Sequence, residues 1–204
     1  SSCFLLLSAH YFVLLLPDLY NFMELLYTIA TTEDELHQIL ALQKDNIRNA
    51  NSMEEEKEQG FVTVQHDLTL LKMMNEAAAH VIAKDADKVV GYALAMTREF
   101  KDKVPVLKSM SDLLDELSDG KERIGNNNYV VMGQICIEKG YRGKGIFQNM
   151  YRHYFQLYKP LYEYVITEVA ARNTRSLKAH LDVGFREVYR YEEKGFETWI
   201  VLLY

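Results

Sequence analysis

Between residues 137 and 146 the chain changes from a β-strand pattern to a helical pattern, and this junction has the composition of a phosphate-binding loop. It contains Gly140, Gly143 and Gly145 together with the cations Arg142 and Lys144. Glycines let backbone N–H groups approach a ligand without a Cβ in the way. The N–H groups of a helix's first turn also lack partners and lie at the positive end of the helix dipole. The pattern therefore predicts a site for a pyrophosphate.

The spacing of the glycines excludes two common phosphate loops. A mononucleotide-binding loop needs Lys followed by Ser or Thr after its last glycine, and here Gly145 is followed by Ile146. The dinucleotide-binding fingerprint, read from Gly143, needs a glycine where the chain has Gln148. The pyrophosphate therefore belongs to another class of ligand.

Two strand-and-helix pairs are expected around this loop. Residues 129–137 are β-branched and apolar, as in a buried strand, and residues 147–158 have the length and aromatic spacing of an amphipathic helix. Residues 164–170 then read as a second strand, and a helix over 173–183 ends at Gly184 and Phe185.

The loop resembles that of the GCN5-related N-acetyltransferase (GNAT) family, whose acetyl-CoA loop reads Gln/Arg-x-x-Gly-x-Gly/Ala. Arg142 and Gly145 match its first two fixed positions, and Ile137 stands where the preceding strand of the family has Val. Phe147 departs from the final Gly/Ala.

The next motif of the family also has a counterpart. In the family an Asn opens a helix, a Tyr follows seven positions later, and Gly-Phe comes four positions after the Tyr. Here Asn173 is followed by His180 at the Tyr position and by Gly184 and Phe185 in register. Two motifs in the right order make a chance agreement improbable.

The resemblance implies a fold of the α/β (α+β) class, in which helices flank a central mixed, mostly antiparallel sheet. Two splayed strands of this sheet hold acetyl-CoA, the expected cosubstrate. The residues implied to bind it are Ile135 and Ile137 through their backbones, Arg142, Gly143, Lys144, Gly145, Ile146, Phe147 and Asn173.

Acetyl transfer needs a base, a hydrogen-bond donor to the oxyanion and a proton for the departing thiolate. The base is needed because an alkyl ammonium, with a pKa of about 10.4, must first lose a proton. Glu168 stands where family members that acetylate protein N-termini carry a base, the alternative being a solvent-facing side chain. His180 stands where the family's Tyr protonates or hydrogen-bonds the CoA sulfur, the alternative being a structural histidine. A backbone N–H of strand 129–137, whose only polar side chain is Gln134, would be the oxyanion donor.

Composition excludes several other classes of protein. The 204 residues suffice for one domain with a core, and 49% apolar with 25% charged residues is ordinary globular usage. A net charge of −6 argues against a nucleic-acid partner. Two isolated cysteines without a CxxC pattern predict a reducing, cytoplasmic location, and no His-Glu-x-x-His pattern points to a metal.

Residues 1–22 are expected to form an apolar extension before a single acetyltransferase domain at 23–204. The apolar run from Cys3 to Leu16 is shorter than the 20 or so residues that span a bilayer, and no Lys or Arg precedes it as in a signal peptide. A membrane anchor is the alternative reading. Residues 99–128 form a helical insert that is expected to wall the acceptor side of the cleft or to make a homodimer contact.

The remaining elements follow from periodicity and turn signals. A capping-box pattern from Thr32 to Glu35 predicts the start of a helix. The other expected elements are strand 24–30, helix 52–59, a hairpin of 78–84 with 88–98 around a turn at 85–87, and closing strands at 185–191 and 196–203.

Three functions are compatible with these patterns. The first is an acetyl-CoA-dependent N-acetyltransferase that lets a primary amine of a small molecule or peptide attack directly in a ternary complex. The second is a catalytically weak CoA-binding sensor or scaffold, favoured by His180 and Phe147 at the two departures from the family pattern. The third is a structural or membrane-associated protein organised around the apolar N-terminus.

Overall fold

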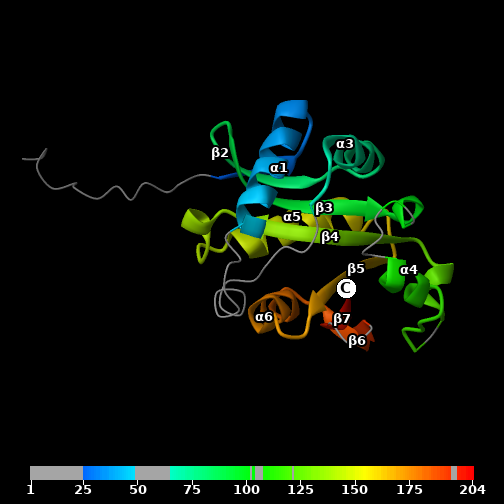
Figure 1. Cartoon of the computed structure of the whole chain (residues 1–204). Coiled ribbons are helices and arrows are strands. Elements are labelled where there is room, and N and C mark those ends of the chain that lie inside the picture. Colours follow the sequence, from blue (N-terminus) through cyan, green and yellow to red (C-terminus); the bar gives the residue numbers. More distant parts are fainter. Residues whose placement is uncertain (1–24, 49–64, 102, 104–107, 121, 194–196) are drawn as a thin grey trace, which may run out of the picture.

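The computed structural model describes residues 25–48, 65–101, 103, 108–120, 122–193 and 197–204. The predicted extension at 1–22 and the helix expected at 52–59 lie outside these ranges. The described chain forms one seven-stranded sheet with helices on both faces (Figure 1). The predicted α+β fold class is confirmed.

The sheet has the order β1-β2-β3-β4-β5-β7-β6, and all neighbours are antiparallel except β4 and β5, which are parallel. The strands are β1 (Leu26–Ile29), β2 (Val81–Asp85), β3 (Lys88–Thr97), β4 (Tyr129–Ile137), β5 (Tyr164–Ala170), β6 (Arg186–Glu193) and β7 (Glu197–Leu203). The helices are α1 (Glu33–Arg48), α3 (Leu68–Ala77), α4 (Lys108–Leu114), α5 (Ile146–Tyr158) and α6 (Thr174–Asp182).

Local signals explain where the first two helices begin. The hydroxyl of Thr32 accepts from the Glu35 N–H at 3.2 Å, and the Glu35 carboxylate accepts from the Thr32 N–H at 3.1 Å, so the predicted capping box is present. Asp67 caps α3 by accepting from the Leu70 N–H at 2.8 Å. Sequence analysis did not predict α3.

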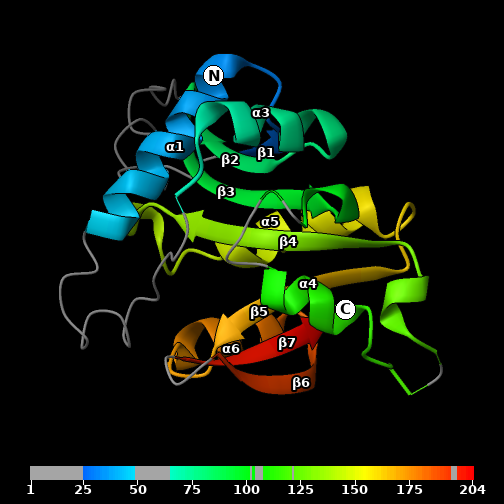
Figure 2. The ribbon, with the colours of Figure 1, turned by 45° about the vertical axis from the view of Figure 1, so that its right-hand side comes forward.

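The two faces of the sheet carry different helices. Tyr92 and Leu94 of β3 pack in one cluster with Leu36 and Ile39 of α1, whereas the alternate β3 residue Ala93 packs with α5. Since alternate residues of a strand point to opposite faces, α1 and α5 cover opposite sides of the sheet. We call these the α1/α3 face and the α5/α6 face; Figure 2 shows α1 and α3 together over the first strands.

The parallel strands β4 and β5 separate after a short contact. They pair only from Tyr129 to Val131 with Tyr164 to Ile166, and Figure 2 shows the two strands diverging beyond this contact. A hydrogen bond of 2.9 Å from the Thr167 hydroxyl to the Met132 carbonyl is a further link between them. Beyond this point no strand among the described residues pairs with the edge of β4 that would face β5.

A β-bulge lies where the strands separate. Leu94 of β3 is opposite Gln134, and the next residue of β3, Ala95, is opposite Met132, so Gly133 is an extra residue of β4. A bulge disrupts the ladder locally and leaves the extra residue unpaired. It also shifts the side-chain alternation, so that Gln134 joins Val131 on the α1/α3 face.

In the described part of the 99–128 insert the α-helix is shorter than the sequence pattern suggests. This helix, α4, has seven residues. Met110, Leu114 and Ile124 are fully buried together with Tyr129 of β4. An ion pair between Arg98 and Asp115 also ties the insert to the end of β3. These side chains make the insert part of the core. No helix in the described ranges is long and apolar enough to cross a bilayer.

Candidate functional site

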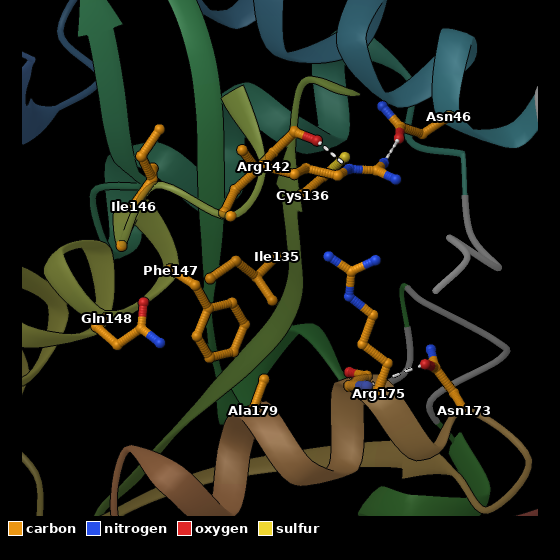
Figure 3. A pocket seen from close by; sticks show the side chains of 14 residues that line it. Asn46, Ile135, Cys136, Arg142, Ile146, Phe147, Gln148, Asn173, Arg175 and Ala179 are labelled. Atoms are coloured by element: carbon orange, nitrogen blue, oxygen red, sulfur yellow. Dashed lines mark hydrogen bonds between the residues drawn. The ribbon is translucent and has the colours of Figure 1, made fainter. Parts of the chain in front are cut away.

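A cleft of about 400 Å³ opens between the end of β4, the N-terminus of α5 and the first turns of α6 (Figure 3). It contains every predicted cofactor-binding residue except Lys144. The lining residues are Asn46, Ile135, Cys136, Ile137, Arg142, Gly143, Gly145, Ile146, Phe147, Gln148, Asn173, Arg175, Ser176 and Ala179. The two sequence motifs, which are about 30 residues apart, thus form opposite walls of one cleft.

The loop before α5 depends on two glycines in the left-handed conformation. Gly143 has a φ of 77°, and Gly145, the N-cap of α5, has a φ of 75°. Residues with a Cβ rarely adopt this conformation. A Cβ placed on either glycine would meet no atom within 4 Å, so the space above them is open. The first turn of α5 contains no acidic residue, and its N–H groups suit an anion.

Arg142 and Lys144, both expected to bind the cofactor, make other contacts in the structure. Arg142 donates from Nε to the Ile137 carbonyl at 3.0 Å and from its guanidinium to Asn46 Oδ1 at 2.6 Å, which ties the loop to β4 and α1. Lys144 is exposed, lies outside the cleft lining, and places Nζ 5.4 Å from the centre of the Tyr141 ring. Arg142 therefore supports the loop, and Lys144 covers a ring outside the cleft.

A third cation, which sequence analysis missed, reaches into the cleft. Arg175 projects from the first turn of α6 toward the loop on the opposite wall (Figure 3). The available signal was its place two positions after Asn173, inside the second motif. Asn173 is buried and caps α6, because its Oδ1 accepts from the Ser176 N–H at 3.1 Å. Its predicted position at the start of this helix is confirmed.

A second cavity of about 80 Å³ adjoins the cleft and lies in the gap between β4 and β5. The two share Ile135, Asn173 and Ser176. Both predicted catalytic residues, Glu168 and His180, line the smaller cavity. The full lining is Met132, Gly133, Gln134, Ile135, Thr167, Glu168, Val169, Ala170, Asn173, Ser176, His180 and Trp199.

Glu168 approaches this cavity from the α1/α3 face. It is two residues beyond Ile166, which packs in the cluster on that face, and alternation therefore places both side chains on the same side. The Tyr191 hydroxyl donates to Glu168 Oε2 at 2.7 Å. This bond orients the carboxylate, and the side chain is half-buried at the cavity wall.

His180 approaches from the α5/α6 face and is almost completely buried. Its Nδ1 lies 2.7 Å from the Ser176 carbonyl, which can only accept, so Nδ1 carries the proton of the neutral ring. Nε2 has no hydrogen-bond partner among the described residues. Burial lowers the pKa of His180 to about 4. At neutral pH the ring is therefore uncharged, and Nε2 is a hydrogen-bond acceptor.

Aromatic rings surround the imidazole and explain its low exposure. Phe147, Tyr151 and Phe185 lie with their ring centres 5.1, 5.4 and 5.6 Å from that of His180. Phe147, which departs from the family's loop pattern, thus contacts His180, which departs from the family's second motif. The described residues contain no cluster of three or more side chains that would ligate a metal ion.

Comparisons with known proteins agree with this architecture. Residues 34–185 match the family described as "Acetyltransferase (GNAT) family". A chain of the NatC complex bound to Gag peptide and CoA is 13% identical, with a TM-score of 0.60 over 89% of this chain and 98% of that one. No match was found among the curated proteins.

Two bacterial structures are similar in the same way. The ribosomal-protein-alanine N-acetyltransferase of Brucella melitensis is 17% identical, with a TM-score of 0.58 over 88% of this chain and 98% of that one. The acetyltransferase yncA of Salmonella typhimurium, with its cofactor acetyl-CoA, is 12% identical, with a TM-score of 0.57 over 88% and 92%. At these identities the likeness shows a shared fold.

Proposed function

The chain belongs to the GNAT family of acetyltransferases, and from this membership we propose that it is an acetyl-CoA-dependent N-acetyltransferase. The acceptor in this proposal is the primary amine of a small molecule or a peptide. One observation carries the proposal: the cleft at the N-terminus of α5 adjoins a gap in the sheet where Glu168 and His180 approach from opposite faces. Such a gap can hold a cosubstrate on one side and an acceptor on the other.

Three features of the cleft fit acetyl-CoA. The left-handed glycines and the N-terminus of α5 offer backbone N–H groups to the pyrophosphate. The guanidinium of Arg175 adds positive charge from the opposite wall. At Ile135 and Ile137 the edge of β4 that no described strand pairs with can offer backbone groups to the amide-containing pantetheine arm, as a neighbouring strand would.

The reaction in this proposal is a direct attack in a ternary complex. Glu168 takes a proton from the ammonium, directly or through a water, and the neutral amine attacks the thioester carbonyl carbon. A backbone N–H near the bulge at Gly133 hydrogen-bonds the developing oxyanion, which then collapses and breaks the C–S bond. The thiolate leaves with CoA and receives a proton.

The tautomer of His180 restricts how this residue could donate that proton to the thiolate. Its resting proton is on Nδ1 and is held by the Ser176 carbonyl, so Nε2 must first receive a proton during the reaction. The nitrogen of the tetrahedral intermediate is the source, since it must lose a proton to form the amide. An imidazolium whose pKa is lowered to about 4 then gives that proton readily to a thiolate.

The same burial of His180 favours the second candidate, a CoA-binding sensor or scaffold without turnover. The discriminating experiment measures release of free CoA thiol from acetyl-CoA in the presence of polyamines, amino acids, aminoglycosides and peptides with free N-termini. The transferase proposal expects amine-dependent release that falls sharply in Glu168→Gln. Calorimetric binding of acetyl-CoA without release by any amine would leave only the sensor.

A further inference from the structure

Ser176 lies where the cleft meets the smaller cavity. Three residues line both spaces, and they are Ile135, Asn173 and Ser176. The side chain of Ile135 is apolar, and that of Asn173 caps α6 through its Oδ1. Ser176 is half-buried in the first turn of the same helix. Of the three, it alone brings a hydroxyl group to the passage between the cleft and the gap in the sheet.

The hydrogen bonds of Ser176 leave its hydroxyl proton without an acceptor. Nδ1 of His180 lies 2.7 Å from the Ser176 carbonyl oxygen and 3.3 Å from Ser176 Oγ. Because the carbonyl oxygen can only accept, Nδ1 carries the ring proton and has no lone pair for the hydroxyl. Ser176 Oγ is thus an acceptor toward His180, and no described residue accepts the proton of the hydroxyl itself.

The surroundings of this hydroxyl favour a ligand atom that gains negative charge. Ser176 is at the positive end of the α6 dipole, and the first turn of this helix contains no acidic residue. The Nδ1–H of His180 approaches Oγ from one turn further along the helix. Hydrogen bonds in a chain polarise one another, so a hydroxyl that accepts from the imidazole is a better donor toward a ligand.

The course of acetyl-CoA in the proposed reaction brings its sulfur to the same place. The pyrophosphate at the N-terminus of α5 and the pantetheine arm along β4 lead through the cleft toward the gap. The amine meets Glu168, which lines the smaller cavity from the α1/α3 face. The thioester carbon must therefore lie where the two spaces join, and the sulfur bonded to it stays on the side of the cleft and Ser176.

We propose, resting on the transferase function above, that the Ser176 hydroxyl donates a hydrogen bond to the sulfur of acetyl-CoA and stabilises the leaving thiolate. When the tetrahedral intermediate collapses, the C–S bond breaks and its electron pair goes to the sulfur, while the hydroxyl keeps its own proton. Ser176 is then a catalytic residue. His180 gains a positioning role, because its Nδ1–H holds Ser176 Oγ in place.

The first test needs no turnover, since it measures the pKa of the thiol of bound CoA. The ultraviolet absorbance of the thiolate is followed against pH in the CoA complexes of the parent and of Ser176→Ala. Complexes with desulfo-CoA, which lacks the sulfur, are subtracted to remove the signal of the tyrosines. Loss of one hydrogen bond to a charged group should raise the pKa of the bound thiol by about one in the variant.

The second test measures catalysis with an amine that the parent acetylates. Ser176→Ala should lower kcat about tenfold, the effect of one lost hydrogen bond to a charged atom, and should change KM for acetyl-CoA less than about twofold. Ser176→Thr keeps a hydroxyl at this position. It should therefore restore most of kcat and most of the low thiol pKa, which a variant that only repaired packing would not do.

The substitution Ser176→Ala is narrow enough to be interpreted. The backbone N–H of residue 176 still reaches Asn173, and the backbone carbonyl still holds His180 Nδ1, so the helix cap and the tautomer are kept. Thr174→Ala is the matched control, because it removes a hydroxyl from the same turn but outside both cavity linings. It should leave the thiol pKa and kcat unchanged. Melting temperature and the Kd values for CoA and desulfo-CoA are measured for every variant.

The outcomes distinguish this inference from the transferase proposal. A raised thiol pKa in Ser176→Ala without turnover of any amine would keep the contact with the sulfur and overturn the reaction. Turnover with the same kcat and the same thiol pKa in parent and Ser176→Ala would keep the reaction and overturn the role of Ser176. An equal weakening of CoA and desulfo-CoA with an unchanged thiol pKa would place the hydroxyl on another part of the ligand and also overturn that role. Failure of the parent to bind CoA would overturn both proposals.

Discussion

The two walls of the site are built by different means. On the α5/α6 side the site consists of two short segments, 142–147 and 173–180, whose backbone N–H groups are arranged by glycines and helix caps. The α1/α3 wall depends on side chains held by a network that joins residues 91 positions apart, Gln43 and Gln134. The α5/α6 side of the site therefore depends on local backbone geometry, whereas the α1/α3 side depends on long-range packing.

The largest expected effect concerns His180, on the α5/α6 side of the site. If His180 transfers a proton to the sulfur, His180→Phe lowers kcat by about 10²–10⁴-fold with little change in CoA affinity. His180→Tyr should restore much of the rate, because a phenol with a pKa near 10 is protonated at neutral pH. Steady-state kinetics with calorimetry check both. A phenylalanine variant as fast as the parent would make His180 a structural residue.

A second change tests whether the backbone of this wall holds the cosubstrate. Acetyl-CoA at a hundredfold excess over its Kd should stabilise the parent by about 2.7 kcal/mol. Gly145→Glu should remove this stabilisation, because a side chain strained at a φ of 75° places a carboxylate in the pyrophosphate position. Thermal unfolding with and without acetyl-CoA measures it.

Gly140→Glu is the matched control for that experiment. Gly140 is in the same segment but outside the cleft lining, and a Cβ there also meets no atom within 4 Å. The control should therefore keep the ligand-induced shift despite the same added charge. An unchanged shift in Gly145→Glu would contradict the position of the pyrophosphate.

A third prediction concerns acid stability. Burial lowers the pKa of His80 to about 3 and that of His180 to about 4, against about 6.5 in the unfolded chain. The unfolded state then binds more protons below pH 6.5, so the free energy of unfolding falls as pH decreases, by about 1.4 kcal/mol per pH unit for each ring. This loss continues to about pH 4 for His180 and about pH 3 for His80.

Urea unfolding between pH 6 and pH 5 isolates the contribution of His180. In His180→Phe the slope of the free energy of unfolding against pH should be shallower by about 1.4 kcal/mol per pH unit than in the parent. Parallel curves for the two proteins would show that His180 does not become charged on unfolding in this window.

The smallest expected effect concerns Arg175, the cation that reaches into the cleft from α6. Arg175→Gln should raise the Kd for acetyl-CoA about fivefold, since an exposed cation contributes about 1 kcal/mol to an anion's binding. Lys178→Gln, which removes an equally charged side chain paired with Asp182 on the same helix, is the control. Repeating the titration with dephospho-CoA shows whether Arg175 contacts the 3′-phosphate or the pyrophosphate. An unchanged Kd would show that Arg175 does not contribute to acetyl-CoA binding.

The sequence by itself predicted what depends on neighbouring residues. The strand at 129–137 and the strand at 164–170 match β4 and β5, and the helix expected at 147–158 begins one residue earlier in α5. The glycine-rich turn from β4 into α5 and the position of Asn173 at the start of α6 were also predicted from the sequence. These features follow from periodicity, helix capping and glycine conformation, which act over a few residues. Sequence analysis did not predict α3, whose start depends on Asp67 as its N-cap.

Only the tertiary structure decided how the side chains of the site are used. Arg142 supports the loop because Asn46 of α1 is beside it, and Arg175 faces the cleft because α6 packs opposite α5. The low pKa of His180 comes from its burial among Phe147 and Tyr151 of α5 and Phe185, which follows α6. The orientation of Gln134 comes from partners on α1 and β3. Each depends on contacts between segments far apart in the chain, which no local pattern encodes.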